Sequence, residues 1–395
     1  MYHTINLNGK WDLVDSDLYF DAEQVCDIRA LPKDKWIQTP VPGDIHQGLV
    51  GAGRIPEPLL GLNSYDSEWT ATRSWWFRNT FNVEAPILER DIVELELNGL
   101  DSNARVYLNG RLVGEHINAF RPFVKDVKKY LDEGQNELLV RLTAGVENVT
   151  EAEMRGPDSS PANTEAGNGR PDRGDSRRNF VRRPQYAFGW DWSPKCPTTA
   201  IGGDILLRAM DKATIRDVYL KPERSSKKEV VVHALVTVET FHPWSTCDGT
   251  VSIALADAEG KTVSAKWTGL LRSGLNFIEC ELRVENPRLW WPVGMGEAHL
   301  YRADAKLEID DKSCEYPAFD WGLRYIELDT RDTFALRVNG KKVFAKGANW
   351  IPADTIYARV RDRDYEILIE EAVGANFNML RIWGGGLYER DIFFQ

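Results

Sequence analysis

The sequence contains little cysteine and no long hydrophobic run. Its five Cys are dispersed, with no Cys-x-x-Cys pair, at Cys26, Cys196, Cys247, Cys280 and Cys314. Such an odd, scattered set is typical of reduced core thiols in a cytoplasmic protein and does not form a metal-binding pattern. No stretch approaches 18 apolar residues, so we expect no membrane span. Residues 1–11 lack the basic and then apolar order of a secretory signal.

Basic residues are also in the minority. The chain has 49 Lys and Arg against 60 Asp and Glu, which gives a net charge of −11. A nucleic-acid partner requires a basic surface for its phosphates, so we expect no such partner. Walker, His-Glu-x-x-His, Gly-x-Gly-x-x-Gly and Ser-His-Asp patterns are missing, and residues 384–386 lack the spacing of a phosphate loop. We therefore expect no cofactor.

The 395 residues are too many for one ordinary domain, so two or three domains are expected. Hydrophobic residues make up 43% of the chain, which is enough for packed cores. Tryptophan is unusually frequent, with 14 residues. Core packing can account for many of them, but indole rings also stack on the apolar faces of sugars. Both interpretations of the tryptophans remain open at this point.

Short alternating segments separated by turn signals fill the first half of the chain. Residues 91–97 and 104–108 alternate, and Asn98-Gly99 and Asn109-Gly110 follow them. Asn-Gly between such segments predicts hairpins, and many short strands without helices predict a β-sandwich over residues 1–212. Residues 150–183 interrupt it as a long insertion rich in Pro, Gly, Asp and Arg, which is typical of a functional or disordered segment.

A second all-β module is predicted over residues 213–330. Alternating segments at 213–220, 229–238, 249–255, 276–282 and 301–309 have the spacing of a sandwich. The length of the module, about 110 residues, is that of an immunoglobulin-like domain.

The pattern changes between residues 331 and 395. Residues 334–338 with Asn339-Gly340 predict a last hairpin, and residues 343–350 and 378–383 predict strands. Between these strands, Tyr365, Leu368, Ile369, Ala372 and Val373 share one face of an amphipathic helix. A strand, helix and strand imply a parallel sheet, as at the start of a (β/α)₈ barrel. Such a barrel needs about 250 residues, so the 65 present predict an incomplete one.

The carboxyl ends of these two strands hold the first candidate site residues. Active sites of (β/α)₈ barrels lie at this edge, where Asn349, Trp350, Arg381 and Trp383 are found. An inward-facing Arg381 would be costly without a partner, which favours a functional role over a structural one. A second candidate, Trp190-Asp191-Trp192, places a carboxylate between two indoles. It could equally be a strand with two core tryptophans and a surface aspartate.

Catalytic carboxylates are not evident. Retaining glycosidases require two carboxyl groups about 5–5.5 Å apart. Glu370 and Glu371 lie off the apolar face of the predicted helix, and Glu389 follows the Gly triplet. We interpret all three as solvated charges.

Together these segments resemble glycoside hydrolase family 2, and within it the β-mannosidases. The order of a sugar-binding, jelly-roll-like sandwich, an immunoglobulin-like sandwich and a barrel is that of the family, so the resemblance implies that residues 1–212 are of the sugar-binding type. The matching motifs extend along the whole chain: Gly9-Lys-Trp11, Val41-Pro-Gly43, Phe120-Arg-Pro122, Gln185-Tyr-Ala-Phe-Gly-Trp-Asp-Trp-Ser-Pro194, Asn286-Pro-Arg-Leu-Trp-Trp-Pro292, Gly322-Leu-Arg324, residues 346–354 and residues 376–388. Ser193 departs from the family, which commonly has Gly at this position.

The resemblance implies a role for each candidate. Asp191, beside Trp190, looks like the carboxylate that binds hydroxyls of the terminal sugar. Trp383 looks like the aromatic wall of that subsite, and Arg381 like the arginine that holds the nucleophile. Other members of the same pocket would be Asn349, Trp350 and Asp354. The acid/base and the nucleophile follow the fourth and seventh barrel strands in the family, so both are expected beyond Gln395.

The resemblance thus predicts a retaining hydrolase of terminal β-linked mannose, without cofactor or metal, present as a fragment that is inactive alone. Another exo-glycosidase of the family, an exo-β-glucosaminidase or a β-galactosidase, is the first alternative. A non-catalytic carbohydrate-binding or partner-binding sandwich protein is the second. In a third, another polypeptide completes the barrel, and the exposed sheet within residues 343–383 is an association surface.

Overall fold

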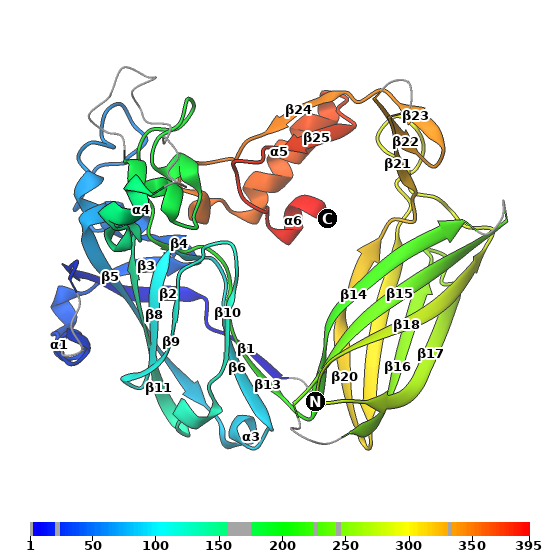
Figure 1. Ribbon diagram of the computed structural model, residues 1–395, viewed down its shortest axis with the longest axis horizontal. Coiled ribbons are helices and arrows are strands. Elements are labelled where there is room, and N and C mark those ends of the chain that lie inside the picture. The colour runs from blue at the N-terminus through cyan, green and yellow to red at the C-terminus, as the bar shows by residue number, and fades with distance from the viewer. Residues whose placement is uncertain (1–2, 20–23, 157–174, 225–227, 242–245, 331–333) are drawn as a thin grey trace.

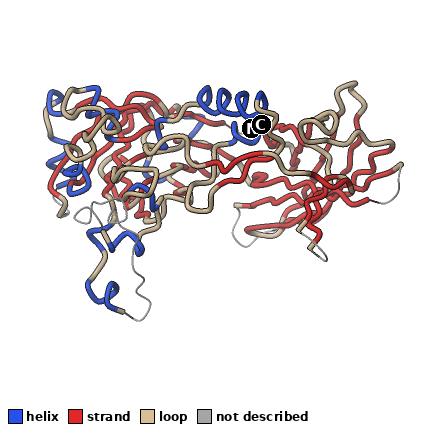
Figure 2. Tube along the Cα trace, turned by 90° about the horizontal axis from the view of Figure 1, so that it is seen from above, coloured by secondary structure: helices blue, strands red, loops and turns tan. Residues whose placement is uncertain are grey.

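A computed structural model describes residues 3–19, 24–156, 175–224, 228–241, 246–330 and 334–395. Two β-sandwiches lie side by side, and the C-terminal segment crosses above them (Figure 1). Seen from above, strands dominate both halves, and the longest helix lies near the middle of the upper side (Figure 2). The predicted mostly β, two-sandwich fold is confirmed. The predicted insertion at residues 150–183 lies partly outside the described residues, which omit 157–174.

The first sandwich contains two antiparallel sheets. One has the order β1 (His3–Asn6), β13 (Ile205–Met210), β6 (Ile92–Leu97) and β10 (Phe123–Asp126). The other has the order β3 (Ile37–Val41), β2 (Gly9–Asp17), β5 (Arg73–Val83), β11 (Gly134–Thr143), β8 (Asn103–Leu108) and β9 (Arg111–His116). A short sheet of β4 (Gly43–Asp44), β12 (Ala200–Ile201) and β7 (Leu100–Asp101) closes one end. Four helices connect the strands: α1 (Gln24–Ala30), α2 (Ile45–Gly51), α3 (Ala85–Leu88) and α4 (Glu151–Arg155).

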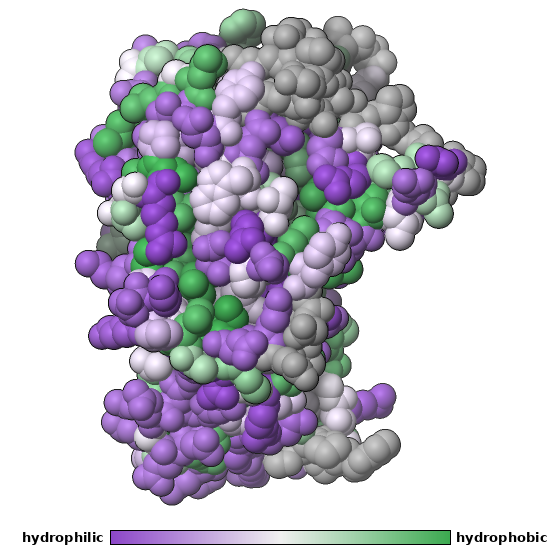
Figure 3. Space-filling model, turned by 90° about the vertical axis from the view of Figure 1, so that its left-hand side faces the viewer, coloured by the Kyte–Doolittle hydropathy of each residue, from purple (hydrophilic) through white to green (hydrophobic). Residues whose placement is uncertain are grey.

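Alternation along the strands builds the core of this sandwich. Trp11, Trp75 and Phe77 are buried between the two sheets together with Leu95. Full burial of each such side chain contributes about 1.5–3 kcal/mol, so Trp11 and Trp75 are core residues, whereas Trp69 is 41% exposed. The outer face is largely polar, with hydrophobic residues in small groups (Figure 3).

Of the two hairpins predicted in this region, one is confirmed and one is wrong. Asn109 and Gly110 both have positive φ, and β8 pairs with β9 across them. The residues Asn98-Gly99, by contrast, lead from β6 into β7, which belongs to a different sheet and pairs with β12. Gly99 does adopt positive φ, but the strands on either side of it pair with other strands and not with each other.

The second sandwich has a three-stranded and a four-stranded sheet. The first is β14 (Ala213–Arg224), β15 (Glu229–Thr240) and β18 (Gly274–Glu285), and the second is β17 (Thr262–Leu271), β16 (Cys247–Ala256), β19 (Tyr301–Ile309) and β20 (Lys312–Trp321). The five segments predicted from alternation all form strands. The alternation of apolar residues did not predict β17 and β20. These are the two edge strands of their sheet, and they bury fewer side chains.

A small antiparallel sheet leads to the C-terminal segment. It consists of β21 (Ile326–Asp329), β22 (Ala335–Val338) and β23 (Lys341–Val343), and the predicted Asn339-Gly340 hairpin joins its last two strands. The single strand predicted at residues 343–350 is wrong, because Val343 ends β23 and a new strand, β24 (Gly347–Trp350), begins after it.

The C-terminal segment contains a parallel βαβ unit. Its strand β24 pairs in parallel with β25 (Met379–Ile382), and α5 (Asp362–Gly374) connects them, as predicted. Arg361 and Asp364 cap the start of α5, and α6 (Asp391–Phe394) follows the unit. Trp350, Val360 and Tyr365 form its core. No helix in the described ranges has the length and apolar composition needed to cross a bilayer.

All five cysteines are free thiols, but not all of them belong to a core. Cys196 and Cys280 are buried, whereas Cys26 is exposed and Cys247 and Cys314 are half-buried. The expectation of core thiols is therefore wrong for Cys26, which lies on the short helix α1.

Candidate functional site

Four aromatic rings meet where the first sandwich contacts the βαβ unit. Trp383, directly after β25, has its ring centroid 5.4 Å from that of Trp190, 6.1 Å from Trp192 and 6.3 Å from Tyr186. Tyr186 and Trp192 are 5.0 Å apart. These separations are those of favourable edge-to-face and tilted ring pairs. We call these four residues the Trp383 cluster; it joins two segments almost 200 positions apart in the sequence.

Asp191 lies at the edge of this cluster and is exposed. The strand interpretation of residues 190–192 is wrong, because they form a tight turn in which the Trp190 amide donates to the Ser193 carbonyl over 2.9 Å. The Ser193 hydroxyl in turn lies 3.0 Å from the Thr355 hydroxyl, which follows β24. The turn is therefore attached to the βαβ unit, and it presents the Asp191 carboxylate to solvent.

Sequence reasoning missed the residue that supports this turn from behind. Arg178 is 1% exposed, and its guanidinium donates to the Gly189 carbonyl over 3.0 Å. The same group lies 5.7 Å from the ring centroid of Trp190. Burial lowers the pKa of Arg178. Its position inside a segment rich in polar residues gave no sign that it would be buried.

Asn349 and Arg381 are neighbours across the parallel strand pair. Arg381 Nη1 donates to Asn349 Oδ1 over 3.1 Å, and both residues are exposed. Arg381 is exposed and not turned into a core, so the cost expected for burying an unpaired arginine does not arise in this structure. Its guanidinium retains donors that can bind a carboxylate.

Trp350 and Asp354 are engaged elsewhere in the βαβ unit. The Trp350 ring packs against Tyr365 and Phe393 on the side of α5. The Asp354 carboxylate accepts from Arg359 over 2.8 Å, and Arg359 also pairs with Glu57 of the first sandwich. In this arrangement both residues hold the unit together and attach it to the sandwich.

The interpretation of Glu389 as a solvated charge is wrong. One carboxylate oxygen accepts from Trp350 Nε1 over 2.9 Å, and the other accepts from the Tyr365 hydroxyl over 2.7 Å. Glu389 thereby joins β24, α5 and the segment after β25. Glu370 and Glu371 are exposed on α5, as predicted.

A buried ion pair underlies the site on the sandwich side. Arg183 and Asp101 are both fully buried, and Asp101 Oδ2 accepts from Arg183 over 3.1 Å, from Thr198 over 2.7 Å and from the Tyr357 hydroxyl over 3.3 Å. Burial raises the pKa of Asp101, and the charge of Arg183 opposes that shift. Since Tyr357 belongs to the βαβ side, this pair is shared by both parts of the site.

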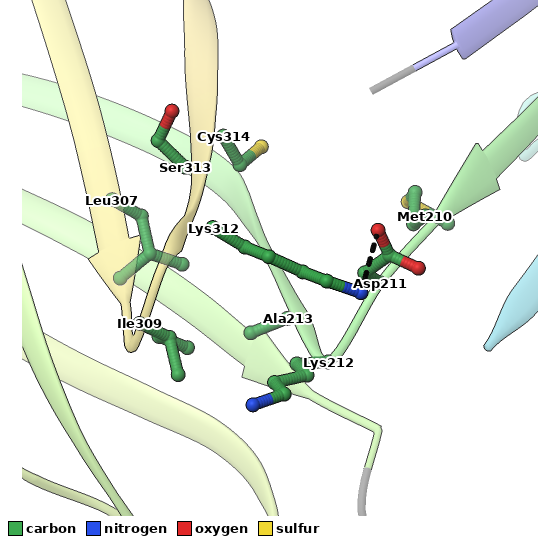
Figure 4. Close-up of a pocket in the computed structure, with 9 residues that line it drawn as sticks. All are labelled: Met210, Asp211, Lys212, Ala213, Leu307, Ile309, Lys312, Ser313 and Cys314. Carbon is green, nitrogen blue, oxygen red and sulfur yellow. Dashed lines mark ion pairs between the residues drawn. The ribbon is translucent and has the colours of Figure 1, made fainter. Parts of the chain in front are cut away.

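The hollow beside the Trp383 cluster has a volume of about 500 Å³. It is lined by Phe120, residues 179–185 and Gly384–Gly386, and not by Asp191. A second cavity lies at the junction of the two sandwiches, where Lys312 reaches from the β19–β20 hairpin toward Asp211 (Figure 4). With a volume of about 20 Å³ it has room for about one water molecule and is not a ligand site. The described residues contain no group of three or more His, Cys, Asp or Glu side chains placed to hold a metal ion.

The Gly triplet after Trp383 offers a matched test of the cluster. A β-carbon on Gly385 would overlap the Trp383 indole, whereas one on Gly384 would meet nothing within 4 Å. Gly385→Ala is therefore expected to displace the Trp383 ring, and Gly384→Ala to leave it in place. Near-ultraviolet circular dichroism, which reports coupled tryptophans, should change in the first variant only. Equal spectra for both variants would contradict this packing.

Two family models match consecutive segments of this chain. Residues 26–203 match the glycosyl hydrolase 2 galactose-binding domain-like family, and residues 213–324 match glycosyl hydrolases family 2. Curated relatives include the β-mannosidase B of Emericella nidulans, 31% identical over 373 residues and 92% of this chain, and that of Aspergillus fumigatus, 30% identical over 379 residues and 93% of this chain. This chain spans 42% and 43% of the length of these two relatives.

Solved structures give the same result. The β-D-mannosidase of Dictyoglomus thermophilum is 32% identical with a TM-score of 0.83, over 99% of this chain and 45% of that one. The exo-chitosanase of Amycolatopsis orientalis shares the fold at 17% identity and a TM-score of 0.72, over 99% of this chain and 42% of that one. Sandwich order, motifs and relatives agree, and the chain belongs to glycoside hydrolase family 2.

Proposed function

We propose that this chain is the substrate-facing N-terminal part of a β-mannosidase that removes terminal β-linked mannose with retention of configuration. The observation that carries the proposal is the identity of 31–32% with β-mannosidases over more than nine-tenths of the chain. The contact between Trp190 and Trp383 supports it, because it brings the turn that carries the exposed Asp191 to the aromatic ring after β25. Sugars are commonly held by such a combination of stacking and hydroxyl hydrogen bonds.

In this proposal the βαβ unit forms the first two strands of a (β/α)₈ barrel. The exposed Arg381, supported by Asn349, would hold the nucleophilic carboxylate, and Asp191 would bind hydroxyls of the terminal sugar. Trp350 and Asp354 would act from behind the pocket, through the contacts described above. No cofactor is required, because the retaining mechanism uses two carboxyl groups. The free cysteines favour a cytoplasmic location.

Neither catalytic carboxylate is among the residues of this chain in our proposal. Glu370 and Glu371 are exposed on α5, and Glu389 is occupied by two donors. We therefore assign none of the three as the acid or the nucleophile.

We predict that the purified 395-residue chain does not hydrolyse 4-nitrophenyl β-D-mannopyranoside. Release of nitrophenol should not exceed that of a mock preparation from cells lacking the gene. Turnover above that background would overturn the assignment of the carboxylates. A protein in which this chain is followed by a complete family 2 barrel should favour the β-mannoside in a panel of aryl glycosides. Preference for a glucosaminide or a galactoside would instead support the alternative specificity of an exo-β-glucosaminidase or a β-galactosidase.

The edge of the βαβ unit is the proposed site of association with the rest of a barrel. Met379 and Ile382 of β25 are more than one-third exposed, and Phe344 before β24 is 83% exposed. Parallel sheets are normally covered on both faces, so this one is expected to bind further strands. The alternative of a non-catalytic sandwich protein gives no reason for an exposed Arg381 at a strand end.

A further inference from the structure

A cluster of buried titratable groups lies in the first sandwich, outside the residues to which the proposed function gives a role. Asp44, His46 and Cys196 are each at most 1% exposed, and His46 and Cys196 are 150 positions apart in the sequence. Burial to this degree keeps all three from touching a substrate. Buried polar groups need hydrogen bonds to compensate their lost hydration, so the partners of each group define its role.

Asp44 holds the His46 ring from one side. Asp44 ends β4 and caps α2, and its carboxylate accepts from the His46 amide over 2.7 Å. Its two oxygens also lie 3.2 and 3.0 Å from His46 Nδ1. Because an ionised carboxylate can only accept, Nδ1 carries a proton and donates it to Asp44.

The other ring nitrogen of His46, Nε2, faces an oxygen and a sulfur. It lies 3.4 Å from Thr70 Oγ1 and 3.7 Å from Cys196 Sγ. Thr70 donates its single hydroxyl proton to the Ser67 carbonyl over 2.7 Å, so toward His46 its oxygen can only accept. Nε2 therefore carries a proton as well, and His46 is an imidazolium. Burial by itself lowers the pKa of His46, but the charges and hydrogen bonds of Asp44 and Cys196 raise it well above its ordinary value.

Cys196 connects this imidazolium to the turn that carries Asp191. The Cys196 amide donates to the Ala187 carbonyl over 2.8 Å. This hydrogen bond closes the base of a loop whose tip is the turn at residues 190–193. A donor that holds the Cys196 side chain therefore fixes the base of the loop, and with it the tip beside Trp383.

The neighbouring charges are paired among themselves. Lys195 lies 4.0 Å from Glu68, and Arg183 pairs with Asp101. His46 thus serves as the cation for the carboxylate that it contacts. A buried pair of this kind is costly to break from either side, because one charge is then left without its partner.

We propose that Asp44 and His46 are positioning residues of the terminal-sugar site. Held by Asp44, the His46 imidazolium donates to Cys196. This hydrogen bond keeps the turn of Asp191 in place against Trp383. The proposal rests on the proposed function for the role of Asp191, whereas the charge of His46 and the hold on the turn do not depend on the identity of the sugar.

The charge of His46 is measured on the unmodified 395-residue chain by nitrogen-15 NMR of its imidazole. Both ring nitrogens should be protonated from about pH 6 to about pH 8, where an unperturbed histidine with a pKa of about 6.5 loses its charge. The Asp44→Asn variant keeps an N-cap of equal quality but lacks the negative charge, so burial should make its His46 neutral at about pH 7. A neutral His46 in the wild type at that pH would overturn the proposal, whatever the variants do.

The hold on the turn is measured by alkylation of Cys196 with iodoacetamide, followed by mass spectrometry. The thiol should react about tenfold faster in Asp44→Asn than in the wild type, since the loop base opens more often after loss of about one charge-assisted hydrogen bond. Cys280, a thiol 5% exposed in the second sandwich, is the control within each sample and should react at its wild-type rate. The double variant Asp44→Asn, His46→Gln supplies a neutral acceptor and a neutral donor, and it should recover most of the protection. It also identifies the His46 signals in the NMR spectrum.

The position of the turn has its own signature in the near-ultraviolet circular dichroism of the Trp383 cluster. In the wild type this signal should be unchanged between about pH 5 and about pH 8. In Asp44→Asn it should weaken over the same range as His46 loses its proton, which a loss of packing alone does not produce.

Equal alkylation of Cys196 in the wild type and in Asp44→Asn would contradict the proposal, as would a circular dichroism signal in Asp44→Asn that does not vary with pH. None of these measurements involves a sugar, so they can succeed where the proposed function fails. If all of them give the expected result while a protein with a complete barrel prefers a glucosaminide or a galactoside, the positioning role stands and the assignment to mannose fails.

Discussion

Replacing Arg183 with Met is expected to destabilise the first sandwich by about 3–5 kcal/mol at neutral pH. Arg183 and Asp101 are both fully buried, so the variant leaves a carboxylate without its cation in a region closed to water. The remaining donors to Asp101, Thr198 and Tyr357, are neutral and compensate only partly. Chemical denaturation followed by tryptophan fluorescence measures the loss, because four buried tryptophans, Trp11, Trp36, Trp75 and Trp76, lie in this sandwich.

The pH dependence of that loss has a definite sign. Burial already raises the pKa of Asp101 in the wild type, and loss of Arg183 raises it further. The folded state then binds a proton more readily than the unfolded state, so stability falls as pH rises from about 3.9 through the raised pKa. The difference between variant and wild type should therefore shrink when the pH is lowered toward 4.5.

Two further variants separate the charge from the loss of packing. Asp101→Asn combined with Arg183→Met removes both charges and should recover a large part of the stability. Arg283→Met, which breaks an exposed pair with Glu229, should cost less than about 1 kcal/mol. A single Arg183→Met variant as stable as Arg283→Met would show that the buried pair does not carry the stability assigned to it.

The fold could be read from the sequence where local signals decide the structure. Asn109-Gly110 forms its hairpin because both residues tolerate positive φ and the flanking strands pair with each other. Asn98-Gly99 has the same signal, but the partner of the strand that follows lies about 100 residues further along. Turn chemistry fixes the local chain direction, and it does not reveal which distant strand completes a sheet.

The site was predictable in part for the same reason. The family resemblance rested on the motif around Trp190 and on the end of β25, and the structure brings Trp190 and Trp383 together. The exposure of Arg381, by contrast, depends on which parts of the chain cover the sheet of β24 and β25. The alternation of residues along a strand does not predict that. Arg178 resembles any other arginine of a polar segment until tertiary packing buries it under Trp190.

Glu389 is the clearest residue that the sequence could not assign. Its donors, Trp350 and Tyr365, lie 39 and 24 positions earlier, on a strand and a helix. Periodicity places none of these contacts, because they depend on how the segment after β25 folds back over α5. The carboxylate raises the pKa of Tyr365 through its hydrogen bond, in addition to the larger effect of burial.

Glu389→Ala is therefore expected to loosen the βαβ unit by about 2–4 kcal/mol, because two donors lose a charged acceptor at once. Glu389→Gln keeps one acceptor oxygen and should cost about half as much. Hydrogen exchange measures the loss locally: amides of β24, α5 and β25 should exchange faster in the alanine variant, while those of β15 in the second sandwich should keep their wild-type rates. Glu370→Ala, which removes an exposed carboxylate from the same helix, is the matched control and should leave all of these rates unchanged. If Glu389→Ala behaved like Glu370→Ala, the two hydrogen bonds would not hold the unit, and the position of Trp383 would have to be set by its aromatic contacts and by the hydrogen bond from its amide to the Trp350 carbonyl.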